Sequence, residues 1–548
     1  AAPPAEADGE ARELLASLWC EVLDLPEVAP TDDFFDLGGD SLLAMRVIAK
    51  AGAAGLRIDS EAFFANPTLA AVAASATRED LAGAEQGAVT GELPLTPSQL
   101  WFFEEDFEDA HHWNGFWPLL SVPERMDPVL LGAALHRVLL HHDALRVRFR
   151  RESGGWRAEV RGPETASPVP FSHVDMSELD DEAAKEAVQA AVARLQGELD
   201  LVDGPPLKLT YFDLGPGRPG RLHLAANWVV LDYYSSRVFF EDLLSAYEQL
   251  RDGSEPALPP KTTSMIEYGR RLIERARDAD VREELPLWTA EEQRSVPELP
   301  VDHEGGRNDQ ASARQLLVLM DPDDTEAIVQ DLPRECECDV SEALLAAIGR
   351  AVSRWSGIDS LMAETEAHGR WGFVEGADVS RTVGRCSTFT PVHLRVSHED
   401  DPRATLESVV EQVGRYPRHG VGHGLLRYLG DDEARRTLAE MPRPSINVNY
   451  WGRANEYLDD AIWPFEESPG PLQSPRGLRP RVLDVFALVL YGQLGIVWIY
   501  SENLHREETV AALAEDAATE LLLMAGRDPS DGAPLAAVPI DDLAAALA

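Results

Sequence analysis

The stretch Asn227-Trp228-Val229-Val230-Leu231-Asp232-Tyr233 lies where an alternating apolar pattern changes to a helical one. Apolar side chains recur at every second position over residues 222–226, which is typical of a half-buried strand. Over residues 239–247 they recur at every fourth position, as on one face of a helix. The sequence therefore predicts a strand that passes through a short turn into a helix. Such a turn is a common place for a functional side chain.

The same stretch resembles the active-site segment of the condensation superfamily of nonribosomal peptide synthetases. In that family the segment reads His-His-x-x-x-Asp-Gly, and its second His transfers a proton. Here Asn227 and Trp228 hold the two His positions, Asp232 retains the Asp, and Tyr233 replaces the Gly. An indole only donates a hydrogen bond, and an amide is not a useful base. The resemblance therefore implies a scaffold without its catalytic His, in which Asp232 forms a buried ion pair with an arginine.

Further motifs resemble the epimerization branch of that superfamily. They lie at residues 95–104, 111–114, 364–370, 380–392, 422–429 and 447–452. One of them is Glu366-Ala367-His368-Gly369-Arg370, whose glutamate is a candidate proton carrier in the family. Epimerization needs a proton carrier on each side of the α-carbon. Because Trp228 occupies the His position, we interpret Glu366 as a relic; Arg385 also departs from this branch, which has an aromatic residue there.

Another pair of histidines, His141-His142, is a tempting candidate for an active-site dyad. Its surroundings match the family's motif at the end of a helix, so we interpret the pair as structural. We therefore expect no catalytic residues in this chain. We also expect no metal site, because the spacing of Cys336 and Cys338 is too short for half of a zinc site.

Residues 33–42 read Asp-Phe-Phe-Asp-Leu-Gly-Gly-Asp-Ser-Leu and place Ser41 at the predicted start of a helix. Taken alone, such a serine is most simply a helix cap. Together with residues 63–69, however, the stretch resembles the peptidyl carrier protein of nonribosomal peptide synthetases. The resemblance implies a four-helix bundle with a 4′-phosphopantetheine arm on Ser41, whose thiol holds a peptide as a thioester. A helix N-terminus would also favour the phosphate.

The chain is strongly acidic, with a formal net charge of −46 over 548 residues. This excess argues against nucleic acid as a partner, because such binding requires basic patches. Four cysteines in so long a chain do not form a disulfide framework. Apolar stretches are too short to span a membrane, and the N-terminus has no secretion-signal pattern. We therefore expect a cytoplasmic protein with reduced thiols.

These motifs divide the chain into a carrier domain at residues 8–78, a linker at 79–92 and one large domain. We predict that the large domain has an N-terminal lobe at 93–260 and a C-terminal lobe at 261–535, joined by the proline-rich residues 255–260. The resemblance implies an all-α four-helix carrier bundle followed by an α/β domain of two chloramphenicol-acetyltransferase-like lobes in a V. Near the C-terminus, residues 485–489 and 494–498 flank Tyr491-Gly492-Gln493 and predict a β-hairpin.

Among superfamily members, an epimerization-like scaffold without its His pair is most similar to the X domain of glycopeptide antibiotic synthetases. That resemblance implies a non-catalytic platform that recruits cytochrome P-450 monooxygenases, which crosslink aromatic side chains of the carrier-bound peptide. The expected neighbours are an adenylation domain upstream and a thioesterase downstream. A docked oxygenase would meet the tethered peptide at high effective concentration.

Two alternatives to recruitment remain open. The large domain is either a divergent epimerization or condensation domain with a relocated base, such as Glu366 alone, or a structural spacer. Exchange of the substrate α-proton with solvent separates the enzyme from the platform. A spacer would bind no partner.

Overall fold

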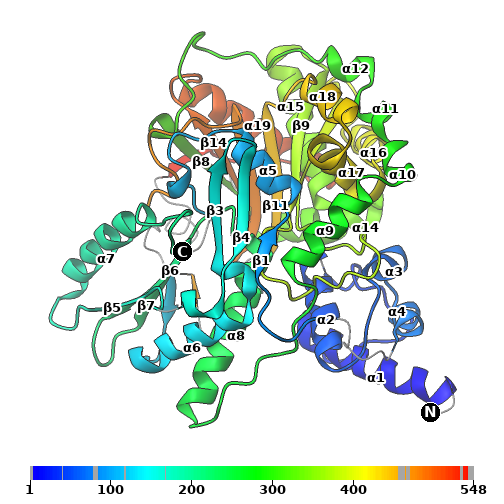
Figure 1. Ribbon diagram of the computed structural model, residues 1–548. Helices are drawn as coiled ribbons and strands as arrows, with labels where there is room; N and C mark the ends of the chain where they lie inside the picture. Colours follow the sequence, from blue (N-terminus) through cyan, green and yellow to red (C-terminus); the bar gives the residue numbers. More distant parts are fainter. Residues whose placement is uncertain are drawn as a thin grey trace.

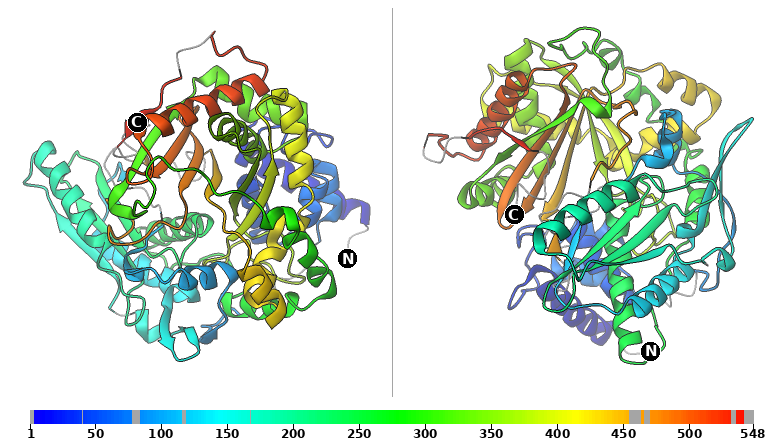
Figure 2. Two further views of the ribbon diagram at one scale, coloured as in Figure 1. Left: turned by 90° about the horizontal axis from the view of Figure 1, so that it is seen from above. Right: turned by 90° about the vertical axis from the view of Figure 1, so that its left-hand side faces the viewer.

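The computed structural model describes residues 4–39, 41–77, 84–115, 119–166, 168–453, 463–464, 470–530 and 535–540. A small helical unit, drawn in blue, lies beside a much larger α/β unit (Figure 1). Within the large unit, the strands belong to separate sheets that are covered by helices (Figure 2). No helix within the described ranges is long and apolar enough to cross a membrane.

The helical unit contains α1 (Pro4–Leu23), α2 (Ser41–Ala53), α3 (Ser60–Ala65) and α4 (Leu69–Ser75). Its core is aromatic, because the ring of Phe34 lies 4.9 Å from that of Trp19 and 5.3 Å from that of Phe63, both edge to face. All three side chains are fully buried. Such pairs stabilise a core beyond the area that they bury. This arrangement agrees with the helical bundle predicted for the first part of the chain.

The N-terminal lobe is built on a sheet in the order β12-β2-β7-β6-β5. Its strands are β2 (Leu120–Val122), β5 (Phe171–Asp175), β6 (Leu207–Asp213), β7 (Gly220–Ala226) and β12 (Trp463–Pro464). The helices of this lobe are α6 (Pro128–His141), α7 (Asp181–Gln196) and α8 (Tyr233–Arg251). A smaller sheet, in the order β1-β4-β3, contains β1 (Gly91–Leu93), β3 (Val147–Glu152) and β4 (Gly155–Val160). β1 therefore starts inside the segment that the sequence assigned to the linker.

Strand β7 is buried on both faces, so the half-buried strand predicted from its alternation is wrong. One face of its sheet packs against α7. Phe212 of β6 and Val188 of α7 belong to the same cluster of buried apolar side chains. The opposite face contributes Leu222 and Leu224 to the main core. Alternation predicts one polar face only where that face meets water, and here helices and loops cover both faces.

The C-terminal lobe is built on a sheet in the order β10-β9-β11-β13-β14-β8-β15. Its strands are β8 (Ala313–Leu319), β9 (Ser360–Ala367), β10 (Thr388–Arg395), β11 (Ile446–Arg453), β13 (Leu483–Leu490), β14 (Gln493–Ser501) and β15 (Val538–Ile540). α15 (Val340–Ser356) packs against α16 (Pro402–Val413) and α19 (Glu507–Met524) on this sheet. Smaller helices are α5 (Pro97–Glu104), α9 (Met265–Arg275), α10 (Ala279–Arg282), α11 (Leu285–Trp288), α12 (Glu291–Arg294), α13 (Pro322–Glu326), α14 (Leu332–Cys336), α17 (Val421–Gly424) and α18 (Asp432–Ala439).

The predicted hairpin is confirmed as β13 and β14, joined by a tight turn. Tyr491 and Gly492 both have positive φ, at 51° and 78°. A two-residue turn with positive φ at both positions matches the twist of the flanking strands. The predicted connection at residues 255–260 has no helix or strand and lies between α8 and α9.

The C-terminal half of the chain donates a strand to the sheet of the N-terminal lobe, which the sequence did not predict. β12 comes from the C-terminal half of the chain but pairs with β2 of the N-terminal lobe, with Trp463 opposite Ser121. The C-terminal half of the chain therefore contributes to both sheets.

Candidate functional site

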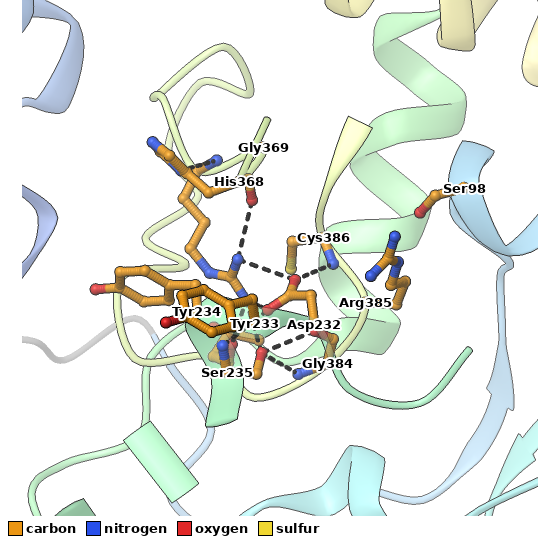
Figure 3. A network of polar contacts seen from close by, with 12 residues as sticks. Ser98, Asp232, Tyr233, Tyr234, Ser235, His368, Gly369, Gly384, Arg385 and Cys386 are labelled. Carbon is orange, nitrogen blue, oxygen red and sulfur yellow. Dashed lines mark hydrogen bonds and ion pairs between the residues drawn. The ribbon is translucent and has the colours of Figure 1, made fainter. Parts of the chain in front are cut away.

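The stretch that opened the sequence analysis forms the turn between β7 and α8. Asp232 caps α8, because its Oδ1 accepts a hydrogen bond of 2.8 Å from the backbone nitrogen of Ser235. Capping by an Asp side chain satisfies one of the free amides of a helix N-terminus. Asp232 and Ser235 are buried, and Figure 3 shows them within a network of polar contacts.

The arginine partner expected for Asp232 is Arg370, from the segment that follows β9. Its two terminal nitrogens donate to the two carboxylate oxygens of Asp232, each at 3.0 Å. The backbone nitrogen of Cys386 adds a third donor at 2.8 Å. Burial alone would raise the pKa of Asp232, but Arg370 and these hydrogen bonds lower it overall. With its oxygens engaged in this way, Asp232 holds the geometry of the turn and has no free lone pair for proton transfer.

Trp228, at the position of the family's catalytic His, is enclosed by aromatic rings. Its ring stacks on that of Phe389 at 5.7 Å with an interplanar angle of 4°, and on that of Phe102 at 5.8 Å. The guanidinium carbon of Arg385 lies 3.1 Å from the centroid of Trp228, which is a close cation–π contact. Two departures from the family pattern, Trp228 and Arg385, are therefore direct neighbours. The sequence showed each departure, but not that they touch.

Glu366 is the retained glutamate of the second motif, and it is tied to the same arginine. Nη2 of Arg385 donates to Oε1 of Glu366 at 2.7 Å. Burial lowers the pKa of Arg385, whereas Glu366 and Asp232 raise it in part. This ion pair engages one oxygen of the Glu366 carboxylate. The structure thus brings Trp228, Arg385 and Glu366 together in one cluster, which we call the silent centre because Trp228 stands where the family has its catalytic His.

Asn227 and Tyr233, which complete the degenerate motif, also have local structural contacts. The Asn227 side chain donates to the backbone oxygen of Ala110 at 2.9 Å and accepts from the backbone nitrogen of Val229 at 3.1 Å. Tyr233 stacks on Trp451 of β11, with ring centroids 5.8 Å apart. These contacts join the turn to neighbouring segments.

The pair His141-His142 lies apart from the silent centre, at the end of α6. Nε2 of His142 lies 2.7 Å from Oδ2 of Asp242, and Arg381 donates to the other oxygen of Asp242 at 2.6 Å. Burial, with a smaller contribution from the adjacent His142, lowers the pKa of His141 to about 4. The ligand atoms of both histidines and Asp242 are near enough for one metal ion. However, Arg381 already neutralises the carboxylate, which agrees with the structural interpretation.

The predicted phosphopantetheine serine begins a helix whose N-terminus suits a phosphate. Ser41 is the first residue of α2, and that helix has no acidic residue in its first turn. Gly38 just before it adopts a φ of +94°, so the preceding turn requires a glycine or a similarly tolerant residue. Free amides and the helix dipole favour a phosphate at this position. The side chain of Ser41 and all of Asp40 lie outside the described residues.

Both the helical unit and the large α/β unit match known protein families. The family described as "Condensation domain" matches residues 89–535, and "Phosphopantetheine attachment site" matches residues 13–75. The chain belongs to the condensation-domain family. A carrier domain with covalent 4′-phosphopantetheine precedes its condensation-type domain, an arrangement of nonribosomal peptide synthetases.

Curated relatives show similarity along almost the whole chain. One of the linear gramicidin synthase proteins from Brevibacillus parabrevis is 38% identical over 535 residues, which is 93% of this chain but 7% of that protein. Tyrocidine synthase 1 from the same organism is 30% identical over 94% of this chain and 47% of its own length. The chain therefore spans less than half of these relatives.

Solved structures support the expected chloramphenicol-acetyltransferase-like fold of the condensation-type domain. The epimerization domain from the third module of tyrocidine synthetase B is 29% identical, with a TM-score of 0.75 over 81% of this chain and 99% of that one. The X-domain from teicoplanin biosynthesis is 19% identical, with a TM-score of 0.62 over 82% of this chain and 98% of that one. The likeness to the X-domain concerns the fold alone.

Proposed function

We propose that the condensation-type domain of this chain is catalytically silent and recruits an enzyme that modifies the peptide on the adjacent carrier. The observation that carries this proposal is the silent centre. Trp228 stands at the position of the family's base, with the guanidinium of Arg385 at 3.1 Å from its ring. Glu366 is bound to the same guanidinium.

Epimerization removes the α-proton from one face and returns a proton to the other, so it needs a proton acceptor and a proton donor. An indole nitrogen does not accept a proton at neutral pH. Arg385 remains protonated near neutral pH, and its Nη2 donates a hydrogen bond of 2.7 Å to Oε1 of Glu366. Condensation would meet the same lack of a base at residue 228. The centre therefore supports binding better than proton transfer.

A silent domain beside a carrier can act by holding a second enzyme near the tethered peptide. Following the X-domain resemblance, we propose cytochrome P-450 monooxygenases as the recruited enzymes and crosslinking of aromatic side chains as their reaction. Tethering raises the effective concentration of the peptide without a new contact at the reacting atoms. The net charge of −46 would assist the capture of a basic face on the partner.

We expect no α-proton exchange from the condensation-type domain. A peptide loaded on the carrier and incubated in D₂O should show deuterium at its α-carbon only at the rate seen without the domain, and Glu366→Gln should not change that rate. The measurement is mass spectrometry of the released peptide. The epimerization domain of tyrocidine synthetase B serves as the positive control. Exchange that exceeds the background and is lost in Glu366→Gln would contradict a silent domain.

We expect recruitment to be independent of the carrier arm. In a calorimetric titration, the full chain should form a stoichiometric complex with a cytochrome P-450 monooxygenase encoded beside its synthetase. Ser41→Ala should bind with the same affinity, because the docking surface is placed on the condensation-type domain. If none of these oxygenases binds, the recruitment proposal fails, and a spacer becomes the better interpretation.

The second candidate, a divergent epimerization domain, draws support from one observation. The side chain of Glu366 is 21% exposed, so solvent reaches it despite its ion pair. A carboxylate with solvent access could exchange a proton with water. The deuterium experiment separates the two candidates, because only this one predicts exchange that depends on Glu366.

A further inference from the structure

A pocket lies next to the silent centre and shares a wall with it. Its lining includes Trp101, Met362, Phe389 and Met441, and its atoms enclose about 860 Å³ of space, the open mouth included. The ring of Trp101 lies 4.8 Å from that of Phe389 and 5.4 Å from that of Trp228. We call this space the side pocket.

The register of β9 and β10 places the side pocket along one sheet face from the silent centre. Phe389 lies opposite Glu366, and Pro391 lies opposite Glu364. Glu364, Met362 and Pro391 all line the pocket. Because alternate residues of a strand share a face, the pocket begins about 7 Å along β9 from Glu366. A peptide that passes the silent centre is therefore within reach of the pocket.

The acidic side chains that line the side pocket all have an arginine partner from the same lining. Arg481 pairs with Glu364 at 2.6 Å, Arg443 pairs with Glu105 at 2.7 Å, and Arg427 pairs with Glu104.

The lining thus offers no net charge to a ligand. Burial lowers the pKa of His423, which also lines the pocket, to about 3, so its ring is neutral near pH 7. Binding an ion here would require breaking one of the pairs, which is costly. A neutral ligand fits best.

Aromatic rings and methionine sulfurs form the apolar part of the lining. Trp101, Trp288 and Phe389 come from different elements, and Met362 and Met441 lie among them. Rings pack well against other rings and against thioethers. This composition favours a flat ring over an aliphatic side chain.

We infer that the side pocket binds a neutral aromatic side chain from the peptide on the carrier. Presentation of that peptide by the carrier rests on the proposed function, whereas ring binding does not. The probe is therefore a free molecule, N-acetyl-L-tyrosinamide, mixed with the full chain. Saturation-transfer NMR and calorimetry should show that it binds at least about fivefold more tightly than N-acetyl-L-leucinamide.

Two variants locate the binding. Ala439 is exposed and lines the pocket, so Ala439→Trp should fill the mouth and weaken binding at least about tenfold. Ala512→Trp, on the exposed face of α19, is the matched control and should bind as the wild type does.

The inference is overturned if the tyrosine amide binds no better than the leucine amide, or if Ala439→Trp leaves its binding intact. Neither result depends on α-proton exchange or on an oxygenase. Failure of the side pocket and failure of the proposed function are therefore distinguishable.

Discussion

Arg370→Ala should lower the free energy of unfolding of the condensation-type domain by about 3–5 kcal/mol, because it leaves a buried carboxylate without its partner. The two side chains of the pair are only 0% and 2% exposed. Arg370 also donates to Oγ of Ser235 at 2.8 Å, so its loss disturbs the start of α8 as well. Denaturant unfolding followed by tryptophan fluorescence measures the change.

A surface pair provides the control for this prediction. Arg151 lies 3.0 Å from Asp106, with both side chains about two-thirds exposed, at 65% and 66%. Arg151→Ala should therefore cost less than about 0.5 kcal/mol. Asp232→Ala combined with Arg370→Ala should cost less than the sum of the single changes, because the second removal leaves no further charge unpaired. Additive losses would show that the pair does not act as a unit.

The same ion pair predicts a dependence on acid. Because the pKa of Asp232 is lowered in the folded protein, its stabilisation is complete above the ordinary aspartate pKa of about 3.9. It is lost as the pH falls through the lower folded value. The loss of unfolding free energy caused by Arg370→Ala should therefore be full at pH 7 and should shrink below about pH 4.

Ser41→Ala should abolish phosphopantetheinylation completely, since alanine has no hydroxyl to take the phosphate. The wild-type chain, incubated with coenzyme A and a phosphopantetheinyl transferase, should gain the mass of one phosphopantetheine group. Intact-protein mass spectrometry resolves the two outcomes.

Ser60→Ala is the matched control for that experiment. Ser60 is also the first residue of a helix in the carrier, at the start of α3. The Ser60→Ala chain should gain phosphopantetheine to the same extent as the wild type. That result would show that the loss in Ser41→Ala does not come from a damaged bundle. If the Ser41→Ala chain still gained phosphopantetheine, the arm would be attached to another residue.

The sequence by itself determined the local elements and the family. The repeat over residues 239–247 predicted a helix that the structure shows as α8, and the residues around Tyr491 predicted the β13–β14 hairpin. Both depend on side-chain periods of a few residues and on turn geometry, which any short stretch carries within itself. The motif around residues 33–42 likewise identified the carrier from consecutive residues. The replaced His pair of residues 227 and 228 was visible at once.

The tertiary structure decided what the silent centre contains. Arg370 reaches Asp232 across 138 positions of sequence. Arg385 stacks on Trp228 only because the segment just before β10 packs against the turn before α8. Tertiary packing also decided the burial of β7 on both faces, the place of β12 in the sheet of the N-terminal lobe, and the side pocket. Each depends on which distant segments pack together, and no period within one stretch specifies the partner that a side chain meets across the fold.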